Sequence, residues 1–209
     1  MTGLMSLVGL SLIASPLIYF SGHLPAVLHN RRINASQLLA FIMLLILFLL
    51  IGATRWETLA PYQPGTIPLH MDGASLVISG LALTLGVLVV AFSGEELATQ
   101  PDQEKYYALI LLLMGMLIGL VCAGDLFNLW VWFEGVTISS YMLVGFYREN
   151  QRALGASIKY FIQTVSGSIF VLFGIALVFI QTGTLTLAPQ TMMSSPILVV
   201  AGAFFVIGF

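Results

Sequence analysis

Apolar runs of about 20 residues recur from one end of this sequence to the other, and they limit the possible folds more than any other feature. A run of this length crosses the roughly 30 Å hydrocarbon core of a bilayer as a helix. Because that core offers no water to backbone N–H and C=O groups, only helices and closed barrels can span it. The 209 residues are 59% hydrophobic and 8% charged, against about 25% charged in soluble domains. The sequence therefore predicts an all-α, polytopic transmembrane helix bundle.

The apolar runs predict about seven spans, at residues 4–20, 36–53, 74–92, 106–123, 126–146, 154–180 and 195–209. The last run holds about 14 apolar residues, too few to cross the bilayer at about 1.5 Å per residue, so we expect an incomplete seventh span. Residues 1–20 lack the basic region of a signal peptide and are interpreted as a retained first helix. We expect residues 1–209 to form a single membrane domain, since no polar stretch is long enough for a second one.

Basic residues are distributed unequally between alternate connections. The second, fourth and sixth connections contain Arg55 alone, whereas the first, third and fifth contain Arg31, Arg32, Lys105, Arg148 and Arg152. Positively charged loops stay on the cytoplasmic side of a membrane. The pattern predicts a multi-pass protein with its N-terminus outside. We expect it in the cell (inner) membrane.

Several classes of site find no support in the sequence. His23, His29 and His70 fall in connections without metal-ligand spacing, so we expect no metal site. There is no glycine-rich phosphate loop and no haem or iron-sulfur ligand set, so we expect no cofactor. Ser139 and Ser140 lack a His or Asp partner for nucleophilic catalysis. Nothing in the charge pattern suggests a nucleic-acid partner, and the lipid bilayer is the expected environment.

Two charged residues lie inside predicted spans, Glu134 in the fifth and Lys159 in the sixth. At about 1.5 Å per residue, Glu134 lies roughly 13 Å below Asp125 and close to the bilayer midplane, while Lys159 lies roughly 8 Å from the cytoplasmic side. A charge at mid-bilayer costs about 2.5 to 3.5 kcal/mol on insertion scales, so intramembrane carboxylates usually handle ions. The alternatives are that Glu134 fixes helix packing and that Lys159 extends to the interface.

Hydroxyl and amide side chains continue the same helix faces. Thr137 and Tyr141 lie three and seven residues after the glutamate, and Gln163 and Ser166 lie four and seven after the lysine. A proton relay needs a donor and an acceptor at each step, which such stripes supply. We therefore predict that these four residues line a relay between the glutamate and the lysine. Asp125 is interpreted as a helix N-cap, with a role at the outer mouth of a proton path as the alternative.

The fourth predicted span contains the stretch GMLIG, with Gly115 and Gly119 four residues apart. This spacing allows two membrane helices to approach closely. We expect it to serve packing within the chain rather than a dimer face.

Two stretches resemble a known family. They are YYALILLLMGMLIGLVCAGDLFNLWVWFEGVTISSYMLVGF at 106–146 and SIKYFIQTVSGSIFVLFGIALVFIQTGTLTL at 157–187. They resemble the antiporter-like membrane subunits of NADH-quinone oxidoreductase (respiratory complex I), chains M and N. Relatives of these chains include the D subunit of the Mrp cation/proton antiporter and the membrane subunits of energy-converting hydrogenases. Residues 70–93 also resemble the family's third helix, and the run D-L-F-N-L-x-V-x-F-E is the most specific element.

The resemblance implies roles for individual residues. Glu134 matches the family's fifth-helix glutamate, regarded as essential for proton translocation, and Lys159 matches a basic position on the sixth helix. The family's principal lysine lies on a broken seventh helix, beyond Phe209 in this numbering. The chain is therefore expected to supply the first six helices and the start of the seventh, with the remainder of the path coming from elsewhere.

The resemblance further implies a proton-translocating subunit without a redox cofactor of its own, in a complex I-like NADH:quinone oxidoreductase. Its partners would be the other membrane subunits of a complex I-like or Mrp-like assembly. Two alternatives stay open at this point. The chain could belong to a Na⁺/proton antiporter of Mrp type, or it could be a structural membrane scaffold.

Overall fold

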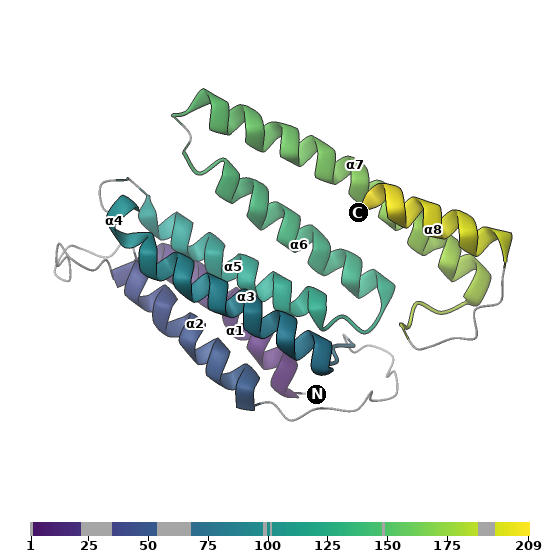
Figure 1. Cartoon of the computed structure of the whole chain (residues 1–209), viewed down its shortest axis with the longest axis horizontal. Coiled ribbons are helices and arrows are strands. Elements are labelled where there is room, and N and C mark those ends of the chain that lie inside the picture. Colours follow the sequence, from purple (N-terminus) through teal and green to yellow (C-terminus); the bar gives the residue numbers. More distant parts are fainter. Residues whose placement is uncertain are drawn as a thin grey trace. The chain divides into compact units, whose positions relative to one another are not determined.

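The computed structural model describes residues 2–21, 35–53, 68–97, 100, 102–147, 149–187 and 195–209. Within these ranges the chain forms helices joined by short connections, with two isolated β-bridges (Figure 1). The helices are α1 (Thr2–Ser21), α2 (Ala35–Ala53), α3 (Gly73–Phe92), α4 (Gly94–Leu97), α5 (Gln103–Val121), α6 (Leu126–Val144), α7 (Gln151–Thr182) and α8 (Pro196–Gly208). The predicted all-α membrane bundle is confirmed.

The predicted spans agree with the helices to within three residues at each end. Among the described residues, five helices are long and apolar enough to cross a membrane, namely α1, α2, α3, α5 and α7. Helix α6 is 19 residues long, like α2 and α5, but its polar side chains make it less apolar and it is not in that set. Helix α8 has 13 residues, or about 20 Å at 1.5 Å per residue, which is shorter than the hydrocarbon core of a bilayer. The four-residue helix α4 was not predicted.

The chain divides into two compact units. The first comprises Met1–Thr58 and Met71–Val121, and the second comprises Leu59–His70 and Cys122–Phe209. The expected single domain over residues 1–209 stays a prediction. Each unit is described below by itself.

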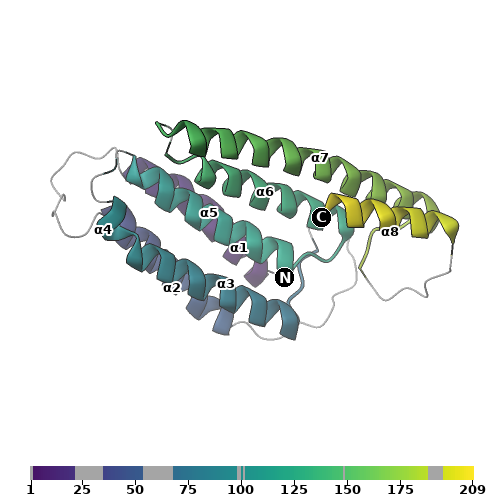
Figure 2. The same ribbon diagram turned by 45° about the horizontal axis from the view of Figure 1, so that its top comes forward.

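The first unit is a bundle of α1, α2, α3 and α5, in which α1 packs along α5 and α2 packs along α3 (Figure 2). Its core is apolar, with fully buried side chains such as Leu44, Leu83 and Leu111. Buried hydroxyl groups join neighbouring helices, since Ser15 Oγ donates to the Ala108 carbonyl at 2.8 Å and Ser75 Oγ donates to the Val121 carbonyl at 2.9 Å.

Gly115 allows α1 to approach α5 closely. A Cβ at this position would lie 1.9 Å from Ser11 Oγ and 2.7 Å from Ser11 Cβ, and Ser11 is fully buried. The expectation that this glycine serves packing within the chain is confirmed.

The second unit contains α6, α7 and α8, with α7 packed along α6 on one side and along α8 on another (Figures 1 and 2). Helix α7 starts at the N-cap Asn150, whose side chain accepts from the backbone N–H of Arg152 at 3.0 Å. It ends at Gly183, where a φ of 70° places the backbone in the left-handed region that glycine tolerates. Its 32 residues correspond to about 48 Å at 1.5 Å per residue, well beyond a bilayer core.

Short backbone segments hold the start of α6 between two connections of the second unit. The backbone N–H of Gly124 donates to the Pro68 carbonyl at 2.8 Å, and the N–H of Leu126 donates to the Leu185 carbonyl at 2.9 Å. The N–H of Leu187 in turn donates to the Gly124 carbonyl at 3.1 Å. The segment before α6 is therefore paired on both sides, which fixes where the helix begins.

The orientation prediction rests largely on positions that fall outside the described residues, namely Arg31, Arg32, Arg55 and Arg148. The outward N-terminus and the inner-membrane location stay predictions.

Candidate functional site

Asp125 begins the helix that carries the candidate carboxylate. Its side chain accepts a hydrogen bond from the backbone N–H of Asn128 at 2.6 Å, which makes Asp125 the N-cap of α6, as interpreted from the sequence. The side chain of Asn128 donates to the Pro68 carbonyl at 3.1 Å and holds this end of the helix further. The alternative role of Asp125 at the outer mouth of a path stays a prediction.

Glu134 lies near the middle of α6 and is half-buried. Ser168 Oγ, from α7, donates a hydrogen bond to Glu134 Oε1. Trp130, one turn before Glu134 on α6, donates from Nε1 to the same Ser168 oxygen at 2.7 Å. Ser168 is 5% exposed, so this hydrogen-bonded group lies at the packed interface of the two helices. We refer to these three residues as the glutamate triad.

The polar stripe predicted on α7 lies on a different side of that helix. Ser168 follows Lys159 by nine residues, about two and a half turns at 3.6 residues per turn, so the two point in opposite directions. Lys159, Gln163 and Ser166 are all exposed in this chain, and Ser166 Oγ donates to the Ile162 carbonyl of its own helix at 2.8 Å. Glu134 and Lys159 are both described, and no ion pair joins them. Their roles in a relay stay predictions.

The polar stripe predicted on α6 lies closer to the glutamate. Thr137 is buried, and its Oγ1 donates to the Glu134 backbone carbonyl at 2.9 Å. Tyr141 is half-buried, its ring packs edge-on against Phe161 with centroids 5.0 Å apart, and its carbonyl accepts from Ser157 Oγ at 2.8 Å. Tyr141 thus takes part in the α6–α7 packing, Thr137 bonds its own helix, and the role of both as relay lining stays a prediction.

Sequence reasoning missed Ser168 and Trp130. Trp130 could have been predicted from the sequence, because a residue four positions before Glu134 lies on the same helix face. Ser168 could not, because its importance depends on which side of α7 packs against α6. The charge of Lys159 favoured the opposite side of α7.

Metal ligands are not gathered in the part of the chain that the structure describes, where no three His, Cys, Asp or Glu side chains lie together. His23 and His29 fall outside those residues.

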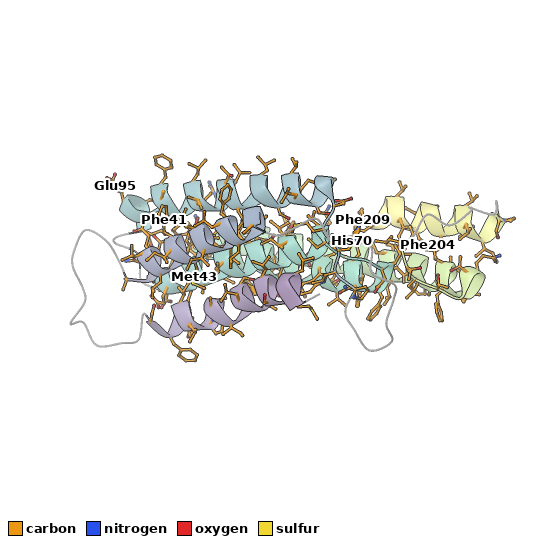
Figure 3. The ribbon with its side chains drawn as sticks, turned by 90° about the horizontal axis from the view of Figure 1, so that it is seen from below. Phe41, Met43, His70, Glu95, Phe204 and Phe209 are labelled. Atoms are coloured by element: carbon orange, nitrogen blue, oxygen red, sulfur yellow. The ribbon has the colours of Figure 1, made fainter. Side chains whose placement is uncertain are left out.

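The apolar side chains of α8 cover part of α7 next to the triad. Figure 3 labels Phe204 on α8 and Phe209 directly after it. The Phe209 ring packs edge-on against Phe133 of α6 with centroids 5.1 Å apart, and the Phe204 ring stacks on Phe170 of α7 at 6.0 Å. Phe133, the residue next to Glu134 on α6, is therefore covered by the Phe209 ring.

The sequence is similar to a known protein family and to several characterised proteins. Residues 123–209, which contain α6, α7 and α8, match the model of the family described as NADH:quinone oxidoreductase/Mrp antiporter, TM. NADH-quinone oxidoreductase subunit L of Pseudomonas aeruginosa is 32% identical over 142 residues, covering 65% of this chain and 23% of that protein. NADH-quinone oxidoreductase subunit N of Desulforudis audaxviator is 33% identical over 150 residues, covering 65% and 30%.

Na(+)/H(+) antiporter subunit A1 of Staphylococcus aureus is 29% identical over 175 residues, covering 80% of this chain and 22% of that protein. The chain thus spans between 22% and 30% of the length of these three relatives.

Solved structures share the fold over nearly the whole chain. The archaeal membrane-bound sulfane sulfur reductase aligns with a TM-score of 0.81 and 26% identity, covering 98% of this chain and 43% of the matched chain. Respiratory complex I from Thermus thermophilus gives 0.72 and 21%, covering 95% and 42%. The Mrp complex from Dietzia gives 0.75 and 23%, covering 99% and 23%. The resemblance stated from the sequence is confirmed.

Proposed function

The chain is a multi-pass membrane protein related to the antiporter-like subunits of NADH:quinone oxidoreductase and of Mrp antiporters, and we propose that it conducts protons in a complex I-like NADH:quinone oxidoreductase. One observation carries the proposal. Glu134 keeps a carboxylate near the middle of α6, a membrane span predicted from the sequence, where it is hydrogen-bonded by a side chain of the next helix. Carboxylates at such positions are expensive to maintain and mark ion or proton paths.

Glu134 would take up and release the transported proton, while Lys159 would act on it through charge. Ser168 contacts Glu134, and Lys159 lies nine residues from Ser168, about 13 Å along α7 at 1.5 Å per residue. Because Lys159 points away from Ser168, the two charges lie at least this far apart and interact by at most about 1 kcal/mol at an effective dielectric constant near 20. Lys159 therefore adjusts the charge on Glu134 from the cytoplasmic side without contacting it.

Electron transfer would belong to partner subunits, and its coupling would reach this chain through conformation and charge. The relatives are named as subunits, and the matched solved chains belong to multi-subunit membrane complexes. Other membrane subunits are accordingly the proposed partners, and they would contribute to the proton path.

Substitutions of Glu134 test the proposal against the scaffold alternative. The Glu134→Gln side chain keeps an oxygen that can accept from Ser168, so it preserves the contact between α6 and α7 while removing the exchangeable proton. Glu134→Ala removes both. Proton transport in membrane vesicles, normalised to the amount of assembled complex, should fall at least tenfold in both variants. If the Gln variant transports normally and only the Ala variant fails to assemble, Glu134 serves packing and the relay is wrong.

The second candidate is a subunit of a Na⁺/proton antiporter of Mrp type. The alignment to the staphylococcal antiporter subunit covers 80% of this chain, against 65% for the oxidoreductase subunits. Vesicles containing the native assembly separate the two functions. Proton movement that follows NADH addition and is independent of Na⁺ supports the oxidoreductase, whereas proton movement driven by a Na⁺ gradient without NADH supports the antiporter.

A further inference from the structure

We propose that Ser168 and Trp130 are positioning residues for Glu134, and that the transported proton enters and leaves the carboxyl group only at Oε2. The inference rests on the proposed function of Glu134 as a proton carrier. It follows from the direction of the two hydrogen bonds in the glutamate triad.

The direction of these bonds is fixed by the donors available. An indole N–H can donate and cannot accept, and a serine hydroxyl has a single hydrogen. Trp130 Nε1 donates to Ser168 Oγ at 2.7 Å and so occupies a lone pair of that oxygen. The one hydrogen of Ser168 is then directed to Glu134 Oε1.

Ser168 differs in this respect from every other Ser or Thr that the structure describes on α6 and α7. A hydroxyl on a helix commonly donates to a backbone carbonyl three or four residues earlier. The other Ser and Thr hydroxyls of α6 and α7 all donate to backbone carbonyls, as seen for Thr137, Ser139, Ser140, Ser157, Thr164, Ser166 and Thr182. Ser168 alone in this set donates to a side chain. The tryptophan accounts for the difference, since its N–H holds the serine oxygen from the other side.

Such an arrangement cannot pass a proton along its length. A hydroxyl relays a proton by accepting one on its oxygen while donating its own. Among the described residues, the donor to Ser168 is the indole N–H of Trp130, which does not release a proton at physiological pH and cannot be reloaded as an acceptor. The Ser168 side of the carboxyl group is therefore closed to proton traffic.

The serine side is also buried. Ser168 is 5% exposed, and the adjacent Gly167 lies so close to α8 that a Cβ there would meet the Gly208 carbonyl oxygen at 2.6 Å. Water therefore has little access to Ser168 from the part of the chain that the structure describes. Proton exchange consequently uses the other oxygen, with the O–H bond to Oε2 forming as a proton arrives from water and breaking as it returns to water.

The positioning pair would act in both states of the carboxyl group. When the group is ionised, Ser168 donates to Oε1 of the carboxylate. When Oε2 carries the proton, Oε1 is the carbonyl oxygen, and Ser168 still donates to it. This keeps the group in one rotamer through the transport cycle. Small misplacements of a reacting group can slow proton transfer by about 10- to 100-fold, so loss of the pair should be measurable.

The test compares matched variants of the assembled complex. Ser168→Ala and Trp130→Phe each remove one bond of the triad, and Ser168→Thr keeps the hydroxyl. Ser140→Ala removes a hydroxyl that bonds only its own helix, and Trp132→Phe removes a buried indole N–H that has no hydrogen-bond partner among the described residues. Two readouts are measured, the proton transport rate per assembled complex and the infrared C=O stretch of protonated Glu134, assigned by its loss in Glu134→Gln.

The expected result is a transport rate at least about tenfold lower in Ser168→Ala, a smaller loss in Trp130→Phe, and near-native rates in Ser168→Thr and both controls. The C=O band should move to higher wavenumber in Ser168→Ala, because the carbonyl loses a hydrogen bond, and it should stay in place in the controls. If Ser168→Ala does not assemble, the Glu134 C=O band and the proton transport rate of Trp130→Phe test the inference instead.

An unchanged band and rate in Ser168→Ala and Trp130→Phe, with transport still blocked in Glu134→Gln, overturns the positioning inference and leaves the proposed function standing. Normal transport in Glu134→Gln overturns the proposed function. In that case a shifted band in Ser168→Ala still shows that the hydrogen bond positions the carboxyl group, but the Oε2 route is rejected with the function.

Discussion

Replacing Gly115 by Ala should destabilise the packing of α1 on α5 by about 1 to 3 kcal/mol. The added Cβ would lie 2.7 Å from Ser11 Cβ, whereas carbon atoms pack at about 3.5 to 4.0 Å, so the two helices would have to separate by roughly 1 Å. Rotation of the Ser11 hydroxyl does not relieve the clash, because the Cβ atoms themselves collide.

A second substitution isolates this contact. Ser11→Gly removes both atoms that meet the new methyl group, and the next atom, Ser11 Cα, lies 3.9 Å away in ordinary contact. The double variant should therefore recover most of the stability that Gly115→Ala loses. Gly9→Ala is the matched control, since nothing lies within 4 Å of a Cβ there.

The assay uses Cys122, the single cysteine, which is fully buried directly after α5. A thiol-reactive dye follows its exposure on heating the detergent-solubilised protein. At about 2 to 4 °C per kcal/mol for a chain of this size, Gly115→Ala should lower the midpoint by several degrees, and the double variant should restore it. A midpoint for Gly115→Ala equal to that of Gly9→Ala would refute the packing argument.

Three further outcomes are expected. Asp125→Ala should cost about 1 kcal/mol of stability by leaving the N–H of Asn128 without its cap, while Asp125→Asn should cost little, as measured by the same thermal assay. Gly167→Ala should loosen α8 from α7 and raise proteolysis after α7, with Gly155→Ala, which faces open space, behaving as native protein. Lys159→Gln should slow proton transport several-fold without abolishing it, in line with an interaction of at most about 1 kcal/mol, and complete loss would show that the lysine carries the proton itself.

The length of the apolar runs was sufficient to predict the helices. A membrane helix needs about 20 apolar residues and ends where polar and turn residues appear, so its limits are visible in one dimension. Even Pro16, which lies inside α1, did not disturb the prediction, because the apolar run continues through it. Helix α4 was missed because its four residues follow from local turn geometry, and two of them are glutamates.

The side of α7 that packs against α6 could not be predicted from hydrophobicity. In a soluble helix the apolar side is the buried side, whereas a membrane helix is apolar on all sides. Small and hydroxyl residues mark the packed face instead. On α7 that face carries Ser157, Thr164 and Ser168, with Phe161 between them, at spacings of three and four residues. The polar stripe was predicted on the opposite side of α7 because the charge of Lys159 is a more conspicuous feature than this spacing.

The carboxylate itself was found from sequence because a single acidic residue in a span is conspicuous. Its partner in the structure is a neutral hydroxyl, which sequence cannot distinguish from the other hydroxyls of α7. The distinction arises from Trp130, which reaches Ser168 across the helix interface.

The most direct test of proton transport by Glu134 is the number of protons moved per NADH oxidised by vesicles that contain the assembled complex with Glu134→Gln. We expect at least a tenfold fall in that ratio while the Ser168 contact and the amount of assembled complex stay unchanged. A native ratio in this variant would contradict the claim that Glu134 carries the proton.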